Sequence, residues 1–218
     1  MNDKNLLNEN NQVTIAGEII SDFTYSHNVL GESFYEFRIA INRLSETIDI
    51  IPCLISERSF DVLKDNIGTY VKINGEFRSY NRYIEKLDKN VLVLTVFVRN
   101  IEIADKEDIK QNSKNNNNII LNGFICKDPI YRKTPLGREI ADVLLAVNRS
   151  YGKTDYIPCV FWGRNAKFVS NLNVGDRLEV YGRIQSRKYV KKISDIESIT
   201  KLAFEVSANL VYVKTKEE

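Results

Sequence analysis

The residues best suited to chemistry gather between positions 148 and 189, where aromatic rings alternate with positive charges. The rings are Tyr151, Tyr156, Trp162 and Tyr189. The interleaved cations are Arg149, Lys153, Arg164, Lys167, Arg183, Arg187 and Lys188. An unpaired nucleic-acid strand exposes base faces on which rings stack, and each phosphate carries a charge that a cation can neutralise. The pattern therefore favours binding of a single-stranded nucleic acid.

The chain repeats itself at an offset of about 106 residues, so each candidate residue has a counterpart in a second copy. The segment 39–43 reads IAINR and the segment 145–149 reads LAVNR. Likewise 49–53 reads DIIPC and 155–159 reads DYIPC. We interpret the chain as one fold that was duplicated and then diverged.

Each copy alternates strand-like runs with turn signals and contains one short stretch of helical periodicity. We predict helices near 57–66 and 164–173, after the third strand of each copy. Five strands with a helix after the third are typical of an OB-fold, a small Greek-key barrel. The predicted fold is all-β, with two tandem five-stranded OB-fold barrels. The predicted strands are 12–21, 33–43, 47–56, 69–80 and 91–104, then 119–127, 138–149, 154–162, 176–189 and 200–213.

The corresponding domain boundaries follow from composition. We expect a flexible polar arm at 1–11, the first OB-fold at 12–104 and the second, main binding copy at 119–214. Residues 105–118 are polar and aperiodic, which predicts a linker. The absence of a long apolar run and the polar amino terminus indicate no membrane span and a cytoplasmic protein.

Charge is distributed unequally between the copies. Residues 1–118 carry 14 Lys and Arg against 18 Asp and Glu, a net of −4, whereas residues 119–218 carry 17 against 11, a net of +6. A polyanion is therefore attracted to the second half of the chain.

Residues suited to catalysis or to metal binding show no comparable pattern. His27 is the sole histidine, and Lys133 stands at its place in the second copy. The three cysteines lack the close paired spacing of a zinc site, and no phosphate-cradling glycine loop occurs. The repeated Asp49 and Asp155 are expected to fix a local turn or hydrogen bond. We expect no enzyme, no metal and no cofactor.

The second half resembles the bacterial single-stranded DNA-binding protein family over about residues 116–213. The resemblance implies that Tyr151, Tyr156, Trp162 and Tyr189 stack on bases, and that four barrels assemble, here as a homodimer. Family members commonly end in an acidic tail that recruits partners; this chain ends in KTKEE, so we do not expect tail-mediated recruitment. The resemblance is carried by 118–123, Asp128–Pro129, Leu136–Gly137, 145–149, 154–163, Ala166 and 182–189.

The first copy lacks the rings at the corresponding positions. Ile50 stands in place of Tyr156, Ser56 in place of Trp162, and Arg82 in place of Tyr189. We therefore predict a weaker or mainly structural site there. Its candidate residues are Arg43, Arg78, Tyr80, Arg82 and Tyr83.

Not every ring can face a ligand, because alternate side chains of a barrel strand point inward. The alternation shows that Phe161 and Trp162 cannot both face the ligand, and the family resemblance implies Trp162 outward and Phe161 inward. The remaining phenylalanines assigned to cores are Phe37, Phe77, Phe97, Phe124, Phe168 and Phe204.

Three functions remain open. The main hypothesis is sequence-independent binding of single-stranded DNA that protects it in replication, recombination or repair. One alternative is an accessory adaptor, in replication restart or encoded by a phage or plasmid, whose barrels mainly bind proteins. The other is a protein that binds single-stranded RNA.

Overall fold

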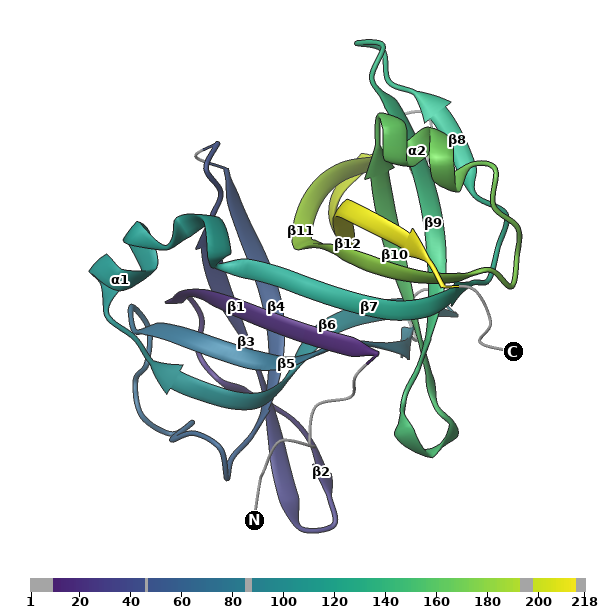
Figure 1. Ribbon diagram of the computed structural model, residues 1–218. Helices are drawn as coiled ribbons and strands as arrows, with labels where there is room; N and C mark the ends of the chain where they lie inside the picture. The colour runs from purple at the N-terminus through teal and green to yellow at the C-terminus, as the bar shows by residue number, and fades with distance from the viewer. Residues whose placement is uncertain (1–9, 46, 85–87, 193–197, 215–218) are drawn as a thin grey trace.

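A computed structural model describes residues 10–45, 47–84, 88–192 and 198–214, with only the backbone described at residue 84 and at 189–192 and 198–201. Two barrels follow one another along the chain (Figure 1). The strands of the first are β1 (Asn11–Ile19), β2 (Thr24–Val29), β3 (Glu32–Asn42), β4 (Ile48–Ser56), β5 (Tyr70–Ile84) and β6 (Lys89–Ile103). Those of the second are β7 (Asn117–Ile125), β8 (Ile130–Lys133), β9 (Glu139–Asn148), β10 (Thr154–Trp162), β11 (Arg177–Lys192) and β12 (Ser198–Val213).

The two barrels close in the same way, which confirms the predicted tandem OB-folds. In the first, β1 pairs with both β3 and β5, and β4 pairs in parallel with β6. In the second, β7 pairs with both β9 and β11, and β10 pairs in parallel with β12. Every second residue of a strand points inward, so each barrel fills with apolar side chains such as Ile15 and Ile73, or Leu121 and Val180.

Strands β1 and β7 join the barrels edge to edge. They pair antiparallel from Asn11 opposite Leu121 to Ile15 opposite Asn117, and they lie side by side in Figure 1. One 12-stranded sheet therefore runs through the molecule. The pairing protects the edges of both strands and fixes how the outer faces of the barrels lie relative to each other.

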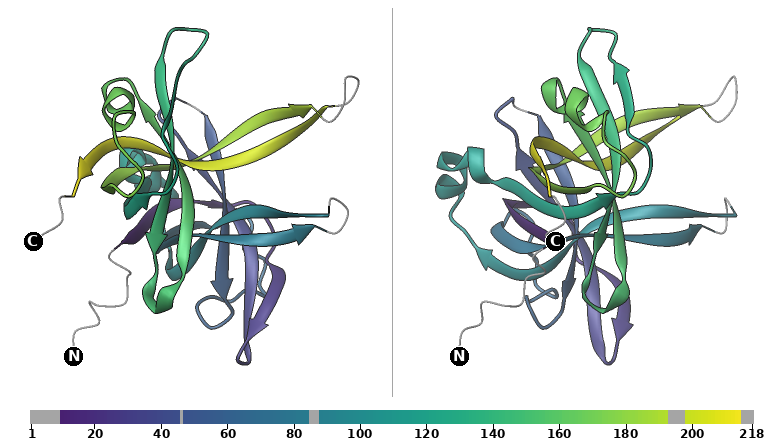
Figure 2. Two further views of the ribbon diagram at one scale, coloured as in Figure 1. Left: turned by 90° about the vertical axis from the view of Figure 1, so that its right-hand side faces the viewer. Right: turned by 45° about the vertical axis from the view of Figure 1, so that its right-hand side comes forward.

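A glycine at the same place in β5 and β11 allows each strand to continue beyond its barrel. The strand register shifts at Gly75 and at Gly182. A Cβ at either position would collide with a backbone carbonyl of the neighbouring strand, that of Phe97 or that of Ser207. Beyond these bulges the hairpins β5–β6 and β11–β12 project from the molecule on the same side (Figure 2).

Several details differ from the sequence predictions. The helix predicted over 57–66 is wrong, because this segment forms turns. Asp61 and Asp65 accept hydrogen bonds from the backbone N–H groups of Leu63 and Ile67, and such local bonds compete with a helix. Its counterpart forms α2 (Arg164–Val169), which buries Ala166 and Val169.

The stretch 105–118, predicted to be aperiodic, is also ordered. It contains α1 (Lys106–Gln111) and the 3₁₀ turn η2 (Ser113–Asn115), and β7 begins within it. Asp105 caps α1 by accepting a hydrogen bond from the N–H of Glu107.

Candidate nucleic-acid interface

Strand β10 presents two of the predicted rings on the outer face of the second barrel. Tyr156 is 45% exposed and Trp162 is 40% exposed, whereas Phe161 is fully buried. The indole Nε1 of Trp162 donates to the Ser207 hydroxyl of β12 at 3.3 Å. Trp162 therefore points outward and Phe161 inward, as the alternation of the strand and the family resemblance together predict.

Tyr151 lies on the loop between β9 and β10 and is fully exposed. It is in the 3₁₀ turn η3 (Ser150–Gly152) with a φ of 69°, a left-handed conformation that is uncommon for a tyrosine. Gly152, with a φ of 73°, follows in the same region. The turn thus holds the Tyr151 ring in solvent, beyond the end of the β10 face.

The predicted cations fall into two groups. Lys153, Arg164, Lys167, Arg187 and Lys188 are exposed. Within this exposed group, Lys167 pairs with Glu139 at 3.1 Å and Arg187 pairs with Glu205 at 3.4 Å. The second group, Arg149 and Arg183, is only partly exposed. The exposed group adds positive charge to the surface of the second barrel.

Arg183 lies away from that group, in a cavity shared by the two barrels. This cavity of about 380 Å³ is also lined by Arg43 and Asp49 of the first barrel. Burial lowers the pKa of Arg183, and the nearby Arg43 guanidinium lowers it further. Arg183 also stands opposite Ser207 of β12, the residue that accepts the hydrogen bond of Trp162.

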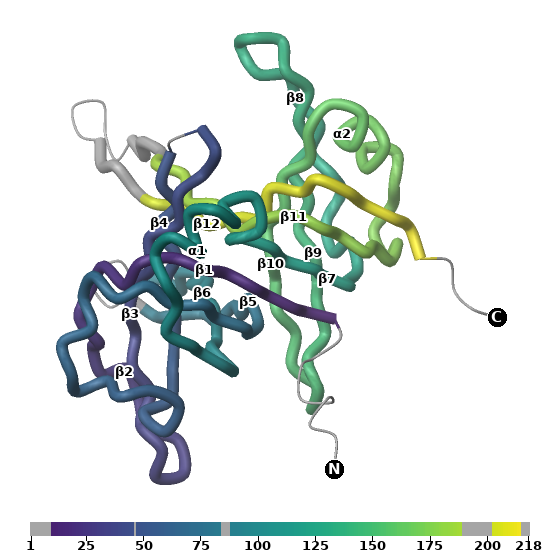
Figure 3. The backbone as a smooth tube through the Cα atoms, turned by 60° about the vertical axis from the view of Figure 1, so that its left-hand side comes forward, coloured from purple at the N-terminus to yellow at the C-terminus, as the bar shows by residue number. Residues whose placement is uncertain are grey.

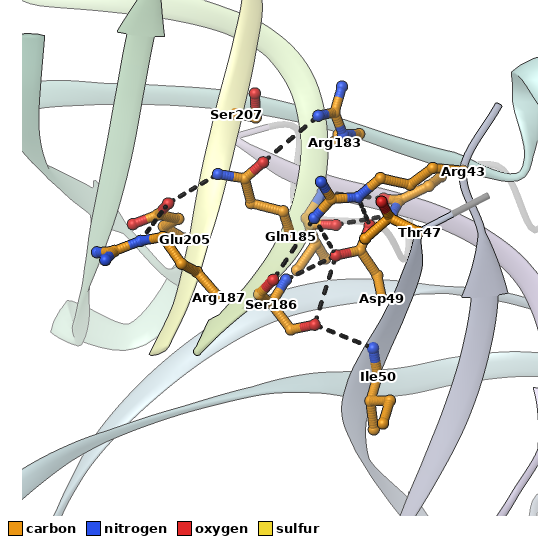
Figure 4. A network of polar contacts seen from close by, with 12 residues as sticks. Arg43, Thr47, Asp49, Ile50, Arg183, Gln185, Ser186, Arg187, Glu205 and Ser207 are labelled. Atoms are coloured by element: carbon orange, nitrogen blue, oxygen red, sulfur yellow. Dashed lines mark hydrogen bonds and ion pairs between the residues drawn. The ribbon is translucent and has the colours of Figure 1, made fainter. Parts of the chain in front are cut away.

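Asp49 and Arg43 belong to a network that spans the barrels (Figure 4). The Nε of Arg43 donates to Asp49 Oδ2 at 2.6 Å, and the Ser186 N–H from β11 donates to Asp49 Oδ1 at 2.8 Å. The Ser186 hydroxyl in turn accepts the Ile50 N–H at 3.1 Å. The hydrogen bond to Asp49 raises the pKa of Arg43.

The same network recurs with the roles of the barrels exchanged. The Nε of Arg149 donates to Asp155 Oδ2 at 2.6 Å, and the Ser79 N–H from β5 donates to Asp155 Oδ1 at 2.5 Å. The Ser79 hydroxyl accepts the Tyr156 N–H at 2.8 Å. We call these two networks the Asp49 clamp (Arg43, Asp49, Ile50 and Ser186) and the Asp155 clamp (Arg149, Asp155, Tyr156 and Ser79).

The clamps extend the roles expected for these residues. Asp49 and Asp155 each accept the expected local hydrogen bonds, from Arg43 and from Arg149, and each also binds a serine of the opposite barrel. In Figure 3, β11 and β12 extend from the second barrel toward β4 of the first. Because the Asp155 clamp holds the Tyr156 backbone, it positions one ring of the interface.

The candidates of the first barrel are also engaged. Arg82 pairs with Glu36 at 2.6 Å and donates to the Tyr80 hydroxyl at 2.6 Å, while Tyr83 donates to Asp88 at 2.6 Å. Ser56 is buried and donates to Glu32. No ring therefore stands at the Trp162 position of this barrel.

Three of the six core assignments of phenylalanines are wrong. Phe37 and Phe77 are fully buried, and Phe204 packs against the core. Phe124 and Phe168 are exposed, and Phe97 is only partly buried, with the Arg78 guanidinium 3.8 Å from its ring centroid. The alternation of β6, with Val96 and Val98 buried on either side, places Phe97 on the outer face.

Tyr189 is the fourth ring that was predicted to stack on bases. The Tyr189 backbone pairs with Lys201, but its side chain lies outside the described residues.

Within the described part of the chain, no group of His, Cys, Asp and Glu side chains could hold a metal ion. The same part contains no helix long and apolar enough to cross a membrane.

Two OB-folds that share one sheet, with rings and cations on an outer face, define a tandem OB-fold protein. Residues 116–210, which make up most of the second barrel, match the model of the single-strand binding protein family. Single-stranded DNA-binding protein 1 of Staphylococcus aureus is 42% identical over 80 residues, covering 34% of this chain and 48% of the relative. Single-stranded DNA-binding protein A of Bacillus subtilis is 41% identical over 80 residues, covering 34% and 46%.

The chain spans about half the length of the curated relatives that it matches. A likeness over nearly the whole chain comes from a solved structure. The single-stranded DNA binding protein from Thermus aquaticus superposes with a TM-score of 0.71 at 20% identity, covering 95% of this chain and 94% of that one. This likeness shows the tandem fold.

Proposed function

We propose that this protein binds single-stranded DNA without sequence preference and protects it during replication, recombination or repair. The observation that carries the proposal is the pair of outward rings on β10, Tyr156 and Trp162, in the barrel that matches the single-strand binding protein family. The Tyr151 ring in solvent adds a third candidate platform on the adjoining loop. Stacking on such rings contributes about 1–3 kcal/mol per base whatever the base, which explains binding without sequence preference.

Exposed lysines and arginines around these rings would neutralise phosphates. The proposed contacts are Lys153, Arg164, Lys167, Arg187 and Lys188, with Arg149 and Arg183 at the boundary between the barrels. Tyr189 is proposed as a fourth platform on the strength of the family resemblance. This chemistry is binding rather than catalysis, and the proposed setting is the cytoplasm.

Trp162 makes the test direct, since it is the sole tryptophan of the chain. Titration with oligo-dT should quench its fluorescence. Trp162→Ala and Tyr156→Ala should each weaken oligo-dT binding by about ten-fold or more, because each removes a stacking platform. Ser56→Ala and Ile50→Ala, at the equivalent places of the first barrel, are the matched controls and should have little effect. Equal losses in both barrels would contradict the assignment of unequal roles.

Two rival functions predict different results. An adaptor that mainly binds proteins would show no length-dependent binding of single strands. An RNA-binding protein would bind oligo-U in preference to oligo-dT of equal length. The family match of the second barrel supports DNA as the first choice.

We further propose that the protein is a homodimer. The family resemblance implies four OB-folds in an assembly, and one chain supplies two. Size-exclusion chromatography with light scattering should give twice the chain mass of 25.2 kDa. A monomer would refute the dimer and leave the binding proposal intact.

A further inference from the structure

The first barrel has a cavity of about 750 Å³ on its outer face. Its lining includes Tyr25 and His27 from β2, Leu54 from β4, and Phe97 from β6. Three arginines and one glutamate also line it, so the surroundings are net positive: Arg78, Arg82, Arg149 and Glu36. Arg149 comes from the second barrel, so the cavity lies at the border between the two outer faces.

A chain of rings leads into this cavity. The His27 and Phe34 rings stack with centroids 5.2 Å apart and planes at 10°. The Phe34 and Phe97 centroids are 5.9 Å apart. These three side chains come from β2, β3 and β6, and together they form an aromatic row across the face of the sheet.

Arginines flank the end of this row. The guanidinium carbons of Arg78 and Arg99 lie 3.8 Å and 4.8 Å from the Phe97 centroid. The buried Glu76 pairs with both, at 2.7 Å and 3.0 Å, and so holds them against the ring. A guanidinium plane fixed in this way offers a base a stacking surface as well as a positive charge.

Strand pairing shows that this row replaces the missing tryptophan. Phe97 stands opposite Glu76 as Ser207 stands opposite Arg183, so Phe97 and Ser207 occupy equivalent places. Ser207 is the residue to which Trp162 donates a hydrogen bond. The first barrel thus has its ring on β6, one strand away from the place where the second barrel has it on β10.

We propose that the first barrel binds an unpaired nucleobase with its adjoining phosphate, on Phe97 and Arg78. The proposal rests on the single-strand binding proposed above and adds a second site to it. The base stacks on the guanidinium of Arg78, which Phe97 supports from beneath, and Arg82 lies close to its phosphate. Arg149 of the second barrel lines the same cavity and contacts the strand between the two sites, so one strand runs over the outer faces of both barrels.

The test compares Phe97→Ala with a control ring far from this cavity, Tyr212→Ala, over oligo-dT strands of increasing length. Tyr212 is exposed near the carboxyl end of β12. Phe97→Ala should weaken binding of strands long enough to cross both barrels by about five-fold or more, the effect of losing one stacked base. The Phe97→Ala variant should leave short-strand binding and the quenching of Trp162 unchanged. Tyr212→Ala should leave the binding of long and of short strands unchanged.

A second measurement does not depend on how the variant folds. Ultraviolet crosslinking of long oligo-dT to the unaltered protein, followed by mass spectrometry, should modify a peptide containing Phe97. Quenching of Trp162 together with crosslinks confined to 151–189 would overturn this second site and leave the proposed function standing. Failure of both quenching and crosslinking would overturn the proposed function itself.

Discussion

Ile50 and Tyr156 occupy the same place in the two barrels, and each donates its backbone N–H to a serine of the opposite barrel. One side chain is aliphatic and the other is a partly exposed ring. The backbone contacts are thus common to both copies, whereas the side chains on the outer face differ. Residues that hold the barrels together were kept, and residues on the face were free to change.

The buried carboxylates beneath the two outer faces, Glu76 and Glu205, also have different partners. In the first barrel, the buried Glu76 pairs with Arg78 and Arg99 under Phe97. In the second, Glu205 accepts from Gln185 at 2.7 Å and pairs with Arg187. Each barrel therefore has a carboxylate that orients neighbouring polar side chains, and that of the first barrel holds two guanidiniums against a ring.

The largest expected effect comes from breaking a clamp. Asp155→Ala and Asp49→Ala should each lower the free energy of unfolding by about 3 kcal/mol, since each leaves an arginine and a serine N–H without their acceptor. Urea unfolding followed by circular dichroism measures this loss. Asp142→Ala is the control, because Asp142 and Arg132 form an exposed pair expected to contribute less than about 1 kcal/mol.

The clamp variants also test whether the outer faces of the two barrels differ in their binding of single-stranded DNA. Asp155→Ala releases the Tyr156 backbone and should weaken oligo-dT binding, whereas Asp49→Ala releases Ile50, which has no ring to misplace. Equal losses of binding in the two variants would show that the clamps act on DNA only through overall stability.

A smaller effect is expected from giving the first barrel the missing ring. Ile50 is partly exposed, so Ile50→Tyr should raise the affinity for long strands by about five- to ten-fold, the lower part of the range for one stacked base. Fluorescence anisotropy of labelled oligo-dT measures the change. Ile50→Val, which keeps the position aliphatic, is the control and should bind like the unaltered protein.

The strands that sequence analysis found are those with an alternating apolar face. It missed β2 and β8, because Thr24–Val29 and Ile130–Lys133 bury no residue and so lack the signal on which the prediction depends. The rings of β10 were found because they are interleaved with cations and match the stacking positions of the family. Alternation showed that Trp162 and Phe161 cannot both face outward, and the resemblance favoured Trp162.

The clamps and the Phe97 row follow from contacts that no local pattern contains. Asp155 and Ser79 are 76 residues apart, and they meet only because β1 and β7 pair. Phe97 sits in an apolar strand that predicts a core residue, but it alternates with the buried Val96 and Val98 and therefore lies on the outer face. The repeat still offered one signal, because Phe97 stands where the second copy has the small polar Ser207.

The smallest expected effect concerns one charge at the turn that precedes each clamp aspartate. Lys153 and Thr47 are equivalent, since their carbonyls accept the N–H of Arg149 and Arg43 at 2.7 Å and 2.8 Å. Each phosphate contact on a single strand contributes about 0.7 to the slope of log affinity against log salt concentration. Lys153→Gln should therefore make the slope shallower by about 0.7, and Thr47→Lys should make it steeper by a similar amount if the strand crosses both barrels. Titrations at several salt concentrations measure both slopes. A changed slope for Lys153→Gln with an unchanged slope for Thr47→Lys would restrict the path of the strand to the second barrel.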